Sequence, residues 1–296
     1  MPVAGNEPMN LWKLSISRRS RTIAAVLVAT VSLGLGAHAA LNKRAHDAAR
    51  AIASEQSEAA AARGSKIALV IGNGHYPDAH APLAQPINDA RALTARLRSS
   101  GFDVDVVEDA SQDDMRRAIA RLQAKVNPDS VVMLYFGGYG VQARRESYMI
   151  PVDARIWKEA DVRRDGISVE SVLNAIAEKG ARAKLVVVDA SRRNPYERRF
   201  RAFSHGLAPI SPPDNALILT SAAPGQVADD SSGQHSVLMT ELLAQLTPQL
   251  AGIESAFRKT RIAISRATDG AQVPSVSSSL PEDVSFTGTV SGKTGG

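Results

Sequence analysis

Two segments of this chain place a hydroxyl-bearing side chain in a loop rich in glycine or charge. Tyr139 lies in LYFGGYGV (134–141), and Ser191 lies in VDASRRNP (188–195). A serine hydroxyl is a weak nucleophile that needs a general base poised near neutral pH to take its proton. Tyrosine, with an ordinary pKa of about 10, is protonated at neutral pH and does not provide that base. These two residue types therefore predict a site that does not by itself support nucleophilic catalysis.

Three histidines offer another source of a base. His75 and His80 follow the first expected strand, and His235 precedes an expected helix. Each is explained more simply as a loop histidine in contact with solvent. His75 and His80 have no convincing third ligand, so we expect neither a metal nor a cofactor. The chain contains no cysteine, so a thiolate nucleophile and disulfide bonds are both excluded.

Short apolar runs alternate with helical patterns from residue 66 onward. The runs at 66–73, 102–107, 130–136, 184–189 and 216–221 predict strands. Apolar residues at helical spacing predict helices over 86–98, 111–126, 168–178, 237–246 and 253–267, and Ser111 is expected to cap the second of these. The alternation predicts an α/β fold with a doubly wound, mostly parallel sheet flanked by helices.

The two loops come directly after neighbouring strands of this expected sheet. Residues 136–140 follow the third strand, and residues 189–191 follow the fourth. Ligands of such sheets bind beyond the carboxyl ends of the strands, so we expect the two loops to face each other there. The glycines on either side of Tyr139 permit a close approach of backbone to backbone.

A dispersed set of motifs accompanies these loops. They are VIGN (70–73), Pro82-Leu83, NDA (88–90), Gly101-Phe102, Tyr135-Phe136, IPVD (150–153), Asn194-Pro195, GLAP (206–209) and APG (223–225). Over residues 66–287 the chain resembles the bacterial caspase-like and metacaspase-like cysteine peptidases of clan CD, which have the caspase-hemoglobinase fold. The separation of roughly 50 residues between Tyr139 and Ser191 matches the His-to-Cys spacing of caspases. The resemblance implies that Tyr139 and Ser191 replace the catalytic His and Cys.

The resemblance also implies roles for nearby groups. The backbone N–H groups of Gly140 and Ser191 match the donors of an oxyanion hole. Asp189 and Asp230 match two carboxylates that line a pocket for Arg or Lys in metacaspase-like relatives. Ser231 stands where those relatives carry Gly, which puts the geometry of that loop in question. An alternative for Asp189 is a carboxylate that caps a turn at the end of its strand.

A basic run follows Ser191 and has two interpretations. It comprises Arg192, Arg193, Arg198, Arg199 and Arg201. Such a run is either a solvated face or a contact for an anionic partner. Nucleic acid is not the expected partner, because much of the net charge of +5 belongs to the first residues of the chain and no basic stripe alternates with aromatic residues.

The chain divides into four expected parts. Residues 1–39 combine a basic stretch, an apolar run and Ala37-His38-Ala39, which is typical of a cleaved export signal. The alternative is an uncleaved anchor, because the apolar stretch over 23–40 approaches the length of a membrane span. Residues 40–65 predict an Ala-rich helical linker, 66–287 the caspase-like domain and 288–296 a disordered tail.

These observations predict an exported, catalytically inactive caspase-like protein of the cell envelope. We expect it in the periplasm, or anchored in the inner membrane and facing the periplasm. It would act by binding a protein or peptide ligand, one with basic residues if the acidic pocket is intact. One alternative is an active endopeptidase that cleaves after Arg or Lys with Ser191 as nucleophile. Another is a structural envelope domain whose cleft is a relic.

Overall fold

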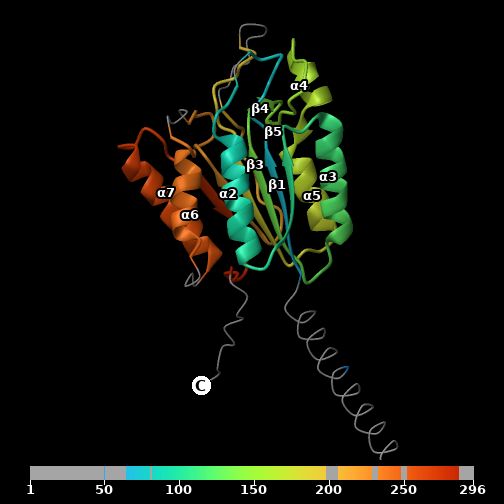
Figure 1. Ribbon diagram of the computed structural model, residues 1–296, viewed down its shortest axis with the longest axis vertical. Helices are drawn as coiled ribbons and strands as arrows, with labels where there is room; N and C mark the ends of the chain where they lie inside the picture. The colour runs from blue at the N-terminus through green and yellow to red at the C-terminus, as the bar shows by residue number, and fades with distance from the viewer. Residues whose placement is uncertain are drawn as a thin grey trace, which may run out of the picture. The chain divides into compact units, whose positions relative to one another are not determined.

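A six-stranded sheet forms the centre of the domain (Figure 1). The computed structural model describes residue 50 and residues 65–80, 82–197, 206–228, 233–247 and 252–286. The strands follow the order β2 (Asp103–Glu108), β1 (Lys66–Gly72), β3 (Val131–Gly137), β7 (Ala183–Asp189), β8 (Ala216–Thr220) and β9 (Ser275–Ser278). All neighbours pair in parallel except β9, which is antiparallel to β8. The predicted α/β fold with a mostly parallel sheet is therefore confirmed.

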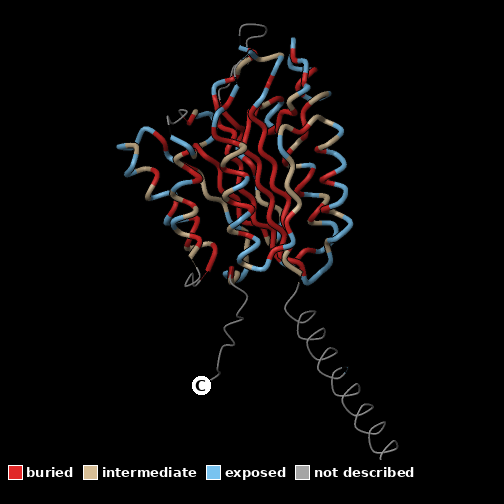
Figure 2. Tube along the Cα trace, in the orientation of Figure 1, coloured by how far each residue is buried: buried red, intermediate tan, exposed pale blue. Residues whose placement is uncertain are grey.

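Helices cover both faces of this sheet (Figure 1). One face carries α2 (Pro86–Ser99), α6 (Val237–Gln245) and α7 (Ile253–Ala267), and the other carries α3 (Gln112–Lys125) and α5 (Val169–Glu178). Successive residues of β3 enter the two cores in turn, with Tyr135 packed on the first side and Phe136 on the second. Because both faces are buried, the central strands are almost continuously apolar, and Figure 2 shows them as the most buried part of the domain.

Helix α3 begins where the sequence predicts it. The hydroxyl of Ser111 accepts a hydrogen bond from the N–H of Asp114, and the Asp114 carboxylate accepts one from the N–H of Ser111. This reciprocal arrangement satisfies N–H groups that have no partner within the helix. The hydroxyls of Ser168 and Ser236 cap α5 and α6 in a similar way.

A second, antiparallel sheet was not predicted from the sequence. It consists of β4 (Gly140–Ala143), β5 (Glu146–Met149) and β6 (Ile167–Ser168), and the short helix α4 (Glu159–Asp165) lies between β5 and β6 in the chain. Arg144 and Arg145 form the turn between β4 and β5 with φ angles of 49° and 69°. This small sheet begins directly after Tyr139, so it fixes the loop that contains this residue.

Several predicted parts lie outside the described residues. They include the leader over 1–39, the linker over 40–65 apart from residues 50 and 65, and the tail over 288–296. Within the part of the chain that the structure describes, no helix is both long and apolar enough to cross a membrane. The apolar stretch at 23–40 belongs to the undescribed part, so anchoring through it stays a prediction.

Candidate functional site

The two predicted loops meet at the carboxyl ends of β3 and β7. These strands pair in parallel, with Gly137 opposite Asp189 at the last position of the register. Beyond the strands, the N–H of Gly138 donates to the carbonyl of Asp189 at 3.2 Å, and the N–H of Gly140 donates to that of Ala190 at 3.0 Å. Backbone hydrogen bonds therefore continue past the sheet and hold the loop of Tyr139 against the loop of Ser191.

Both glycines beside Tyr139 allow close packing of its loop, Gly138 against Tyr76 and Gly140 against the loop of Ser191. A Cβ atom at Gly138 would lie 2.5 Å from the hydroxyl of Tyr76, and one at Gly140 would lie 2.8 Å from the carbonyl oxygen of Ala190. Real Cβ atoms do not approach neighbours this closely. Gly140 therefore allows the contact between the two loops, and Gly138 allows the contact with Tyr76.

Tyr139 is part of a buried aromatic pair. Its side chain is 6% exposed, and its ring meets that of Tyr76 edge-on with centroids 4.8 Å apart. The Tyr76 hydroxyl accepts a hydrogen bond from the N–H of Tyr139 at 3.0 Å and donates one to the carbonyl of Ile150 at 3.1 Å. Burial raises the pKa of Tyr76, so its hydroxyl stays neutral and keeps the proton that it donates to Ile150. The position of the implied catalytic His is thus held by aromatic packing.

Ser191 is fully buried, and its hydroxyl oxygen has no hydrogen-bond partner. Its backbone N–H donates to the hydroxyl of Ser221 at 3.2 Å, while its carbonyl accepts from the N–H of Ala228 at 2.6 Å. The other predicted oxyanion-hole donor, the N–H of Gly140, is engaged by Ala190. Both N–H groups already have partners within the chain, and their role toward an oxyanion stays a prediction.

Two of the three candidate histidines are oriented by carboxylates. Nδ1 of His75 lies 2.5 Å from Asp109, and Nδ1 of His235 lies 2.8 Å from Asp89. Because the Ser191 hydroxyl makes no hydrogen bond, neither imidazole is in position to take its proton. His80, the third candidate, is exposed with a φ angle of 52°.

Asp189 lies in a buried ion pair with Arg192. The Arg192 Nη1 atom lies 3.6 Å from Asp189 Oδ1, donates at 2.9 Å to the carbonyl of Gly138, and also donates to the backbone carbonyl of Asp189. Arg192 is 5% exposed, so it is a buried residue and does not belong to a solvated basic face. The second oxygen of Asp189 has no partner. Asp230, the other predicted pocket residue, lies outside the described residues.

Asp89 belongs to the same region and was not singled out from the sequence. It lies on the buried face of α2 and accepts hydrogen bonds from His235 and from the N–H of Ser236. Burial raises its pKa to about 6, and the nearby charge of Asp189 adds to this, while the hydrogen bonds of His235 and Ser236 oppose it. The sequence signal that could have identified Asp89 is its place among the apolar positions of the helix, where a carboxylate is unusual.

The comparison with known proteins agrees with this fold. The family model described as the caspase domain matches residues 65–285. The chain belongs to the caspase family. Human mucosa-associated lymphoid tissue lymphoma translocation protein 1 is 30% identical over 133 residues, which are 45% of this chain and 16% of the human protein. Its mouse homologue is 29% identical over the same shares of the two chains. The matched part is thus a small fraction of each of these relatives.

Unsatisfied polar atoms are concentrated at the strand ends of this caspase-family domain. Six buried side-chain atoms in the described residues lack a hydrogen-bond partner, and four of them belong to Tyr135, Asp189, Ser191 and Asn194. Burial raises the pKa of Tyr135, as do the charges of Asp189 and Asp89. A folded chain pairs nearly all of its buried polar groups, so such a cluster indicates a site where a ligand or water completes the bonding.

Proposed function

We propose that this caspase-family domain binds protein or peptide ligands without cleaving them, and that it does so in the bacterial cell envelope. The observation that carries the proposal is the state of Ser191. Its hydroxyl is buried and bonded to no base, and the implied base position is a tyrosine packed against another tyrosine. Without a group to take the proton, the hydroxyl does not attack a peptide carbonyl at a useful rate.

The charges beneath the strand ends support binding of a basic residue. Two buried carboxylates, Asp89 and Asp189, share this region with one buried guanidinium, that of Arg192. Arg192 approaches Asp189 at 3.6 Å, which is too long for a strong hydrogen bond, and the other Asp189 oxygen has no partner. A ligand guanidinium would supply the missing donor to Asp189. Asp230 would add a further carboxylate, as the family resemblance implies.

Envelope location is supported by the first 39 residues. They combine a basic stretch with an apolar run and a small-residue cleavage pattern, which is the composition of an export signal. A binding domain in the periplasm would meet peptides and proteins of the envelope.

A binding assay with two labelled peptides tests this proposal. We expect a peptide with a central Arg to bind and to be recovered intact, and a matched peptide with Glu to bind poorly. Asp189→Asn should weaken binding of the Arg peptide about tenfold or more, since a charge-assisted hydrogen bond contributes about 1.5–3 kcal/mol and each 1.4 kcal/mol is a factor of ten.

The matched control is Asp113→Asn. Asp113 is an exposed carboxylate in the first turn of α3, so its neutralisation alters the net charge without touching the site. Both variants must melt like the wild type. Equal affinity for Arg and Glu peptides, or equal binding by Asp189→Asn and the wild type, would refute the binding role and favour a structural envelope domain.

One observation favours a second candidate, a serine-type endopeptidase that cleaves after Arg or Lys. Asp89 orients His235 through a hydrogen bond at 2.8 Å, which is how a carboxylate orients a catalytic imidazole. The Ser191 hydroxyl would have to leave its buried position and reach that imidazole. This candidate requires that turnover depends on both Ser191 and His235.

A further inference from the structure

Trp157 is the most exposed of the large apolar side chains in the described part of the chain. It is 62% exposed, against 50% for Ile262 and 37% for Val273. Its neighbour Ile156 is fully buried in the cluster that contains Tyr139. The loop therefore buries one apolar residue and presents the next one to the surface.

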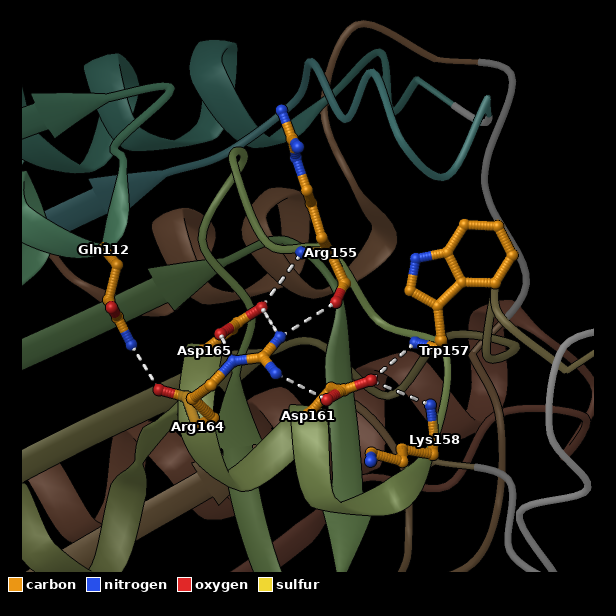
Figure 3. A network of polar contacts seen from close by, with 7 residues as sticks. All are labelled: Gln112, Arg155, Trp157, Lys158, Asp161, Arg164 and Asp165. Atoms are coloured by element: carbon orange, nitrogen blue, oxygen red, sulfur yellow. Dashed lines mark hydrogen bonds and ion pairs between the residues drawn. The ribbon is translucent and has the colours of Figure 1, made fainter.

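A network of polar contacts holds the Trp157 loop in place (Figure 3). The carboxylate of Asp161 accepts hydrogen bonds from the N–H groups of Trp157 and Lys158, each at 3.1 Å. Burial alone would raise the Asp161 pKa, but these two N–H groups and the charge of Arg164 lower it overall. Asp161 therefore stays ionised and keeps both hydrogen bonds.

The same network also holds the start of the loop. Arg164 donates to Asp161 at 2.7 Å and to Asp165 at 2.6 Å and 2.9 Å, and it donates to the carbonyl of Arg155 at 3.3 Å. Asp165 in turn accepts from the N–H of Arg155 at 3.1 Å. Both ends of the loop are fixed. Binding of a partner to Trp157 would therefore cost little free energy for ordering the loop.

The side chains beside Trp157 are cationic and make no ion pair within the described residues. They are those of Arg155 and Lys158, which flank Trp157 in the loop. The acidic groups here are already engaged, with Asp161 and Asp165 bonded to Arg164, and Glu159 3.9 Å from Arg144. The surface therefore carries positive charge that the chain itself does not neutralise.

Arg155 also lines a surface hollow of about 280 Å³ next to this loop. The rest of the lining comes from Ala154, Arg164, Asp165 and, on the other side, Gln112 and Asp153. Asp153 accepts a hydrogen bond from the N–H of Gln112, and Asp165 is paired with Arg164. The Arg155 guanidinium is thus the group of this hollow that an added carboxylate would meet.

We propose that Arg155, Trp157 and Lys158 form a docking surface for an acidic segment of a partner protein. An apolar side chain of that segment would pack on the Trp157 ring, and a carboxylate would pair with Arg155. Tryptophan and arginine are the residue types that most often dominate the energy of protein interfaces. A fixed loop that exposes an indole between two unpaired cations has the composition of such an anchor.

The Trp157 loop lies at the edge of the sheet opposite to the start of β1. The chain enters the domain at Lys66, at the amino end of β1. The loop belongs to the opposite edge, because the carbonyl of Ile150 accepts from Asn73 just beyond the carboxyl end of β1 (Figure 1).

Trp157 itself can report the binding. The chain has two tryptophans, so the variant Trp12→Phe leaves Trp157 as the single indole. The probe is a synthetic peptide in which glutamates flank two leucines, and its analogue carries glutamine in place of each glutamate. We expect a saturable blue shift of the indole emission with the Glu peptide, and binding at least tenfold weaker with the Gln analogue.

Variants of the surface and of a distant helix complete the test. Labelled Glu peptide should bind at least tenfold more weakly to Trp157→Ala and to the double variant Arg155→Glu, Lys158→Glu. Ile262→Ala and Lys259→Glu, two exposed changes on α7, should leave its affinity unchanged. Binding of the Arg peptide should persist in Trp157→Ala, so this proposal and the proposed function can fail separately.

Three results would overturn the proposal. Equal binding of the Glu peptide and its Gln analogue would remove the role of charge. Equal effects of the surface variants and the α7 variants would show that the contact is not specific to this loop. A blue shift with vesicles of anionic phospholipid, together with none for the Glu peptide, would make the surface a membrane contact.

Discussion

Arg192 already occupies part of the acidic region at the strand ends that is proposed to bind a basic ligand. Its guanidinium lies between the carboxylate of Asp189 and the carbonyl of Gly138, and it is almost completely buried. A buried carboxylate without a partner would be strongly destabilising, and Arg192 provides Asp189 with a cationic partner inside the domain. A basic ligand would add to this cation, and its affinity depends on the oxygen of Asp189 that Arg192 leaves unpaired.

Asp89 should make the stability of the protein depend on pH. Its pKa is about 6 in the folded protein and 3.8 in its ordinary state, because it is buried and lies near Asp189. The folded state therefore holds a proton more tightly than the unfolded chain. The resulting stabilisation is fully present below pH 3.8 and is lost as the pH rises through about 6, with a magnitude of up to about 3 kcal/mol.

The variant Asp89→Asn should remove this dependence, because an amide does not ionise. Melting measured across the window from pH 4 to pH 7 should show a flatter stability profile than that of the wild type. His235→Gln is the companion variant. Loss of the hydrogen bond that lowers the Asp89 pKa should move the window to higher pH. Profiles of equal slope in Asp89→Asn and the wild type would contradict this account.

The central strands and the helices that cover them could be predicted from the sequence. Runs such as VVMLYFG in β3 are buried on both faces and are therefore apolar throughout, and α3 has both an apolar stripe and a cap. Strand β9 was missed because its sequence, SVSS, has little apolar content. The β4–β5 hairpin was missed because Arg144 and Arg145 form its turn, where glycine or asparagine is the usual signal.

The sequence could predict only those residues of the candidate site that lie at the carboxyl ends of strands. Asp189 is the last residue of β7, and Tyr139 and Ser191 each lie two residues beyond the end of a strand, so the parallel pair of β3 and β7 brings them together. Asp89 lies near Asp189 because α2 packs on the sheet in one particular rotation. The helical pattern of the sequence does not determine that rotation well enough to place a single polar side chain at the site. The burial of Arg192 was also missed, because a run of arginines is usually solvated.

Tyr76 joins the loop after β1 to the loop of Tyr139 and to the segment after β5. Tyr76→Phe would leave the buried N–H of Tyr139 without its partner, while the carbonyl of Ile150 would keep its hydrogen bond from Asn73, and an unpaired buried group costs about 1–3 kcal/mol. We expect a loss of about 1–3 kcal/mol in the free energy of unfolding, measured by urea denaturation. The control Tyr148→Phe loses a hydrogen bond to the exposed Glu146 and should lose less than about 1 kcal/mol. Equal losses would show that the Tyr76 hydroxyl has no special role.

At the scale of the whole molecule, the domain presents chemically different regions. The acidic residues Asp89 and Asp189 lie beneath the strand ends, while Arg155, Trp157 and Lys158 form a cationic surface on the loop after β5. The caspase fold supports both, because loops at the carboxyl edge of a sheet vary without disturbing the core. The two proposals therefore concern separate regions, one for a basic segment and one for an acidic segment, and each can be tested without the other.

The leader should determine where the protein acts. If residues 1–39 are a cleaved export signal, the mature protein should begin near Ala40 and leave the cell with the soluble periplasmic fraction. N-terminal sequencing of the protein from fractionated cells shows where the mature chain begins and in which fraction it is found. Replacement of Arg18 and Arg19 by Glu should hold the precursor in the cytoplasm. Full-length protein retained in washed membranes would identify residues 23–40 as an anchor.

Turnover of fluorogenic peptides with Arg or Lys before the reporter group tests the central claim most directly. The wild type and Ser191→Ala should both release no fluorophore above the background rate, because the buried Ser191 hydroxyl has no base. The double variant Tyr139→His, Ser191→Cys shows in the same assay whether a restored pair can act in this scaffold. Turnover by the wild type that disappears in Ser191→Ala would contradict the account and establish a serine peptidase.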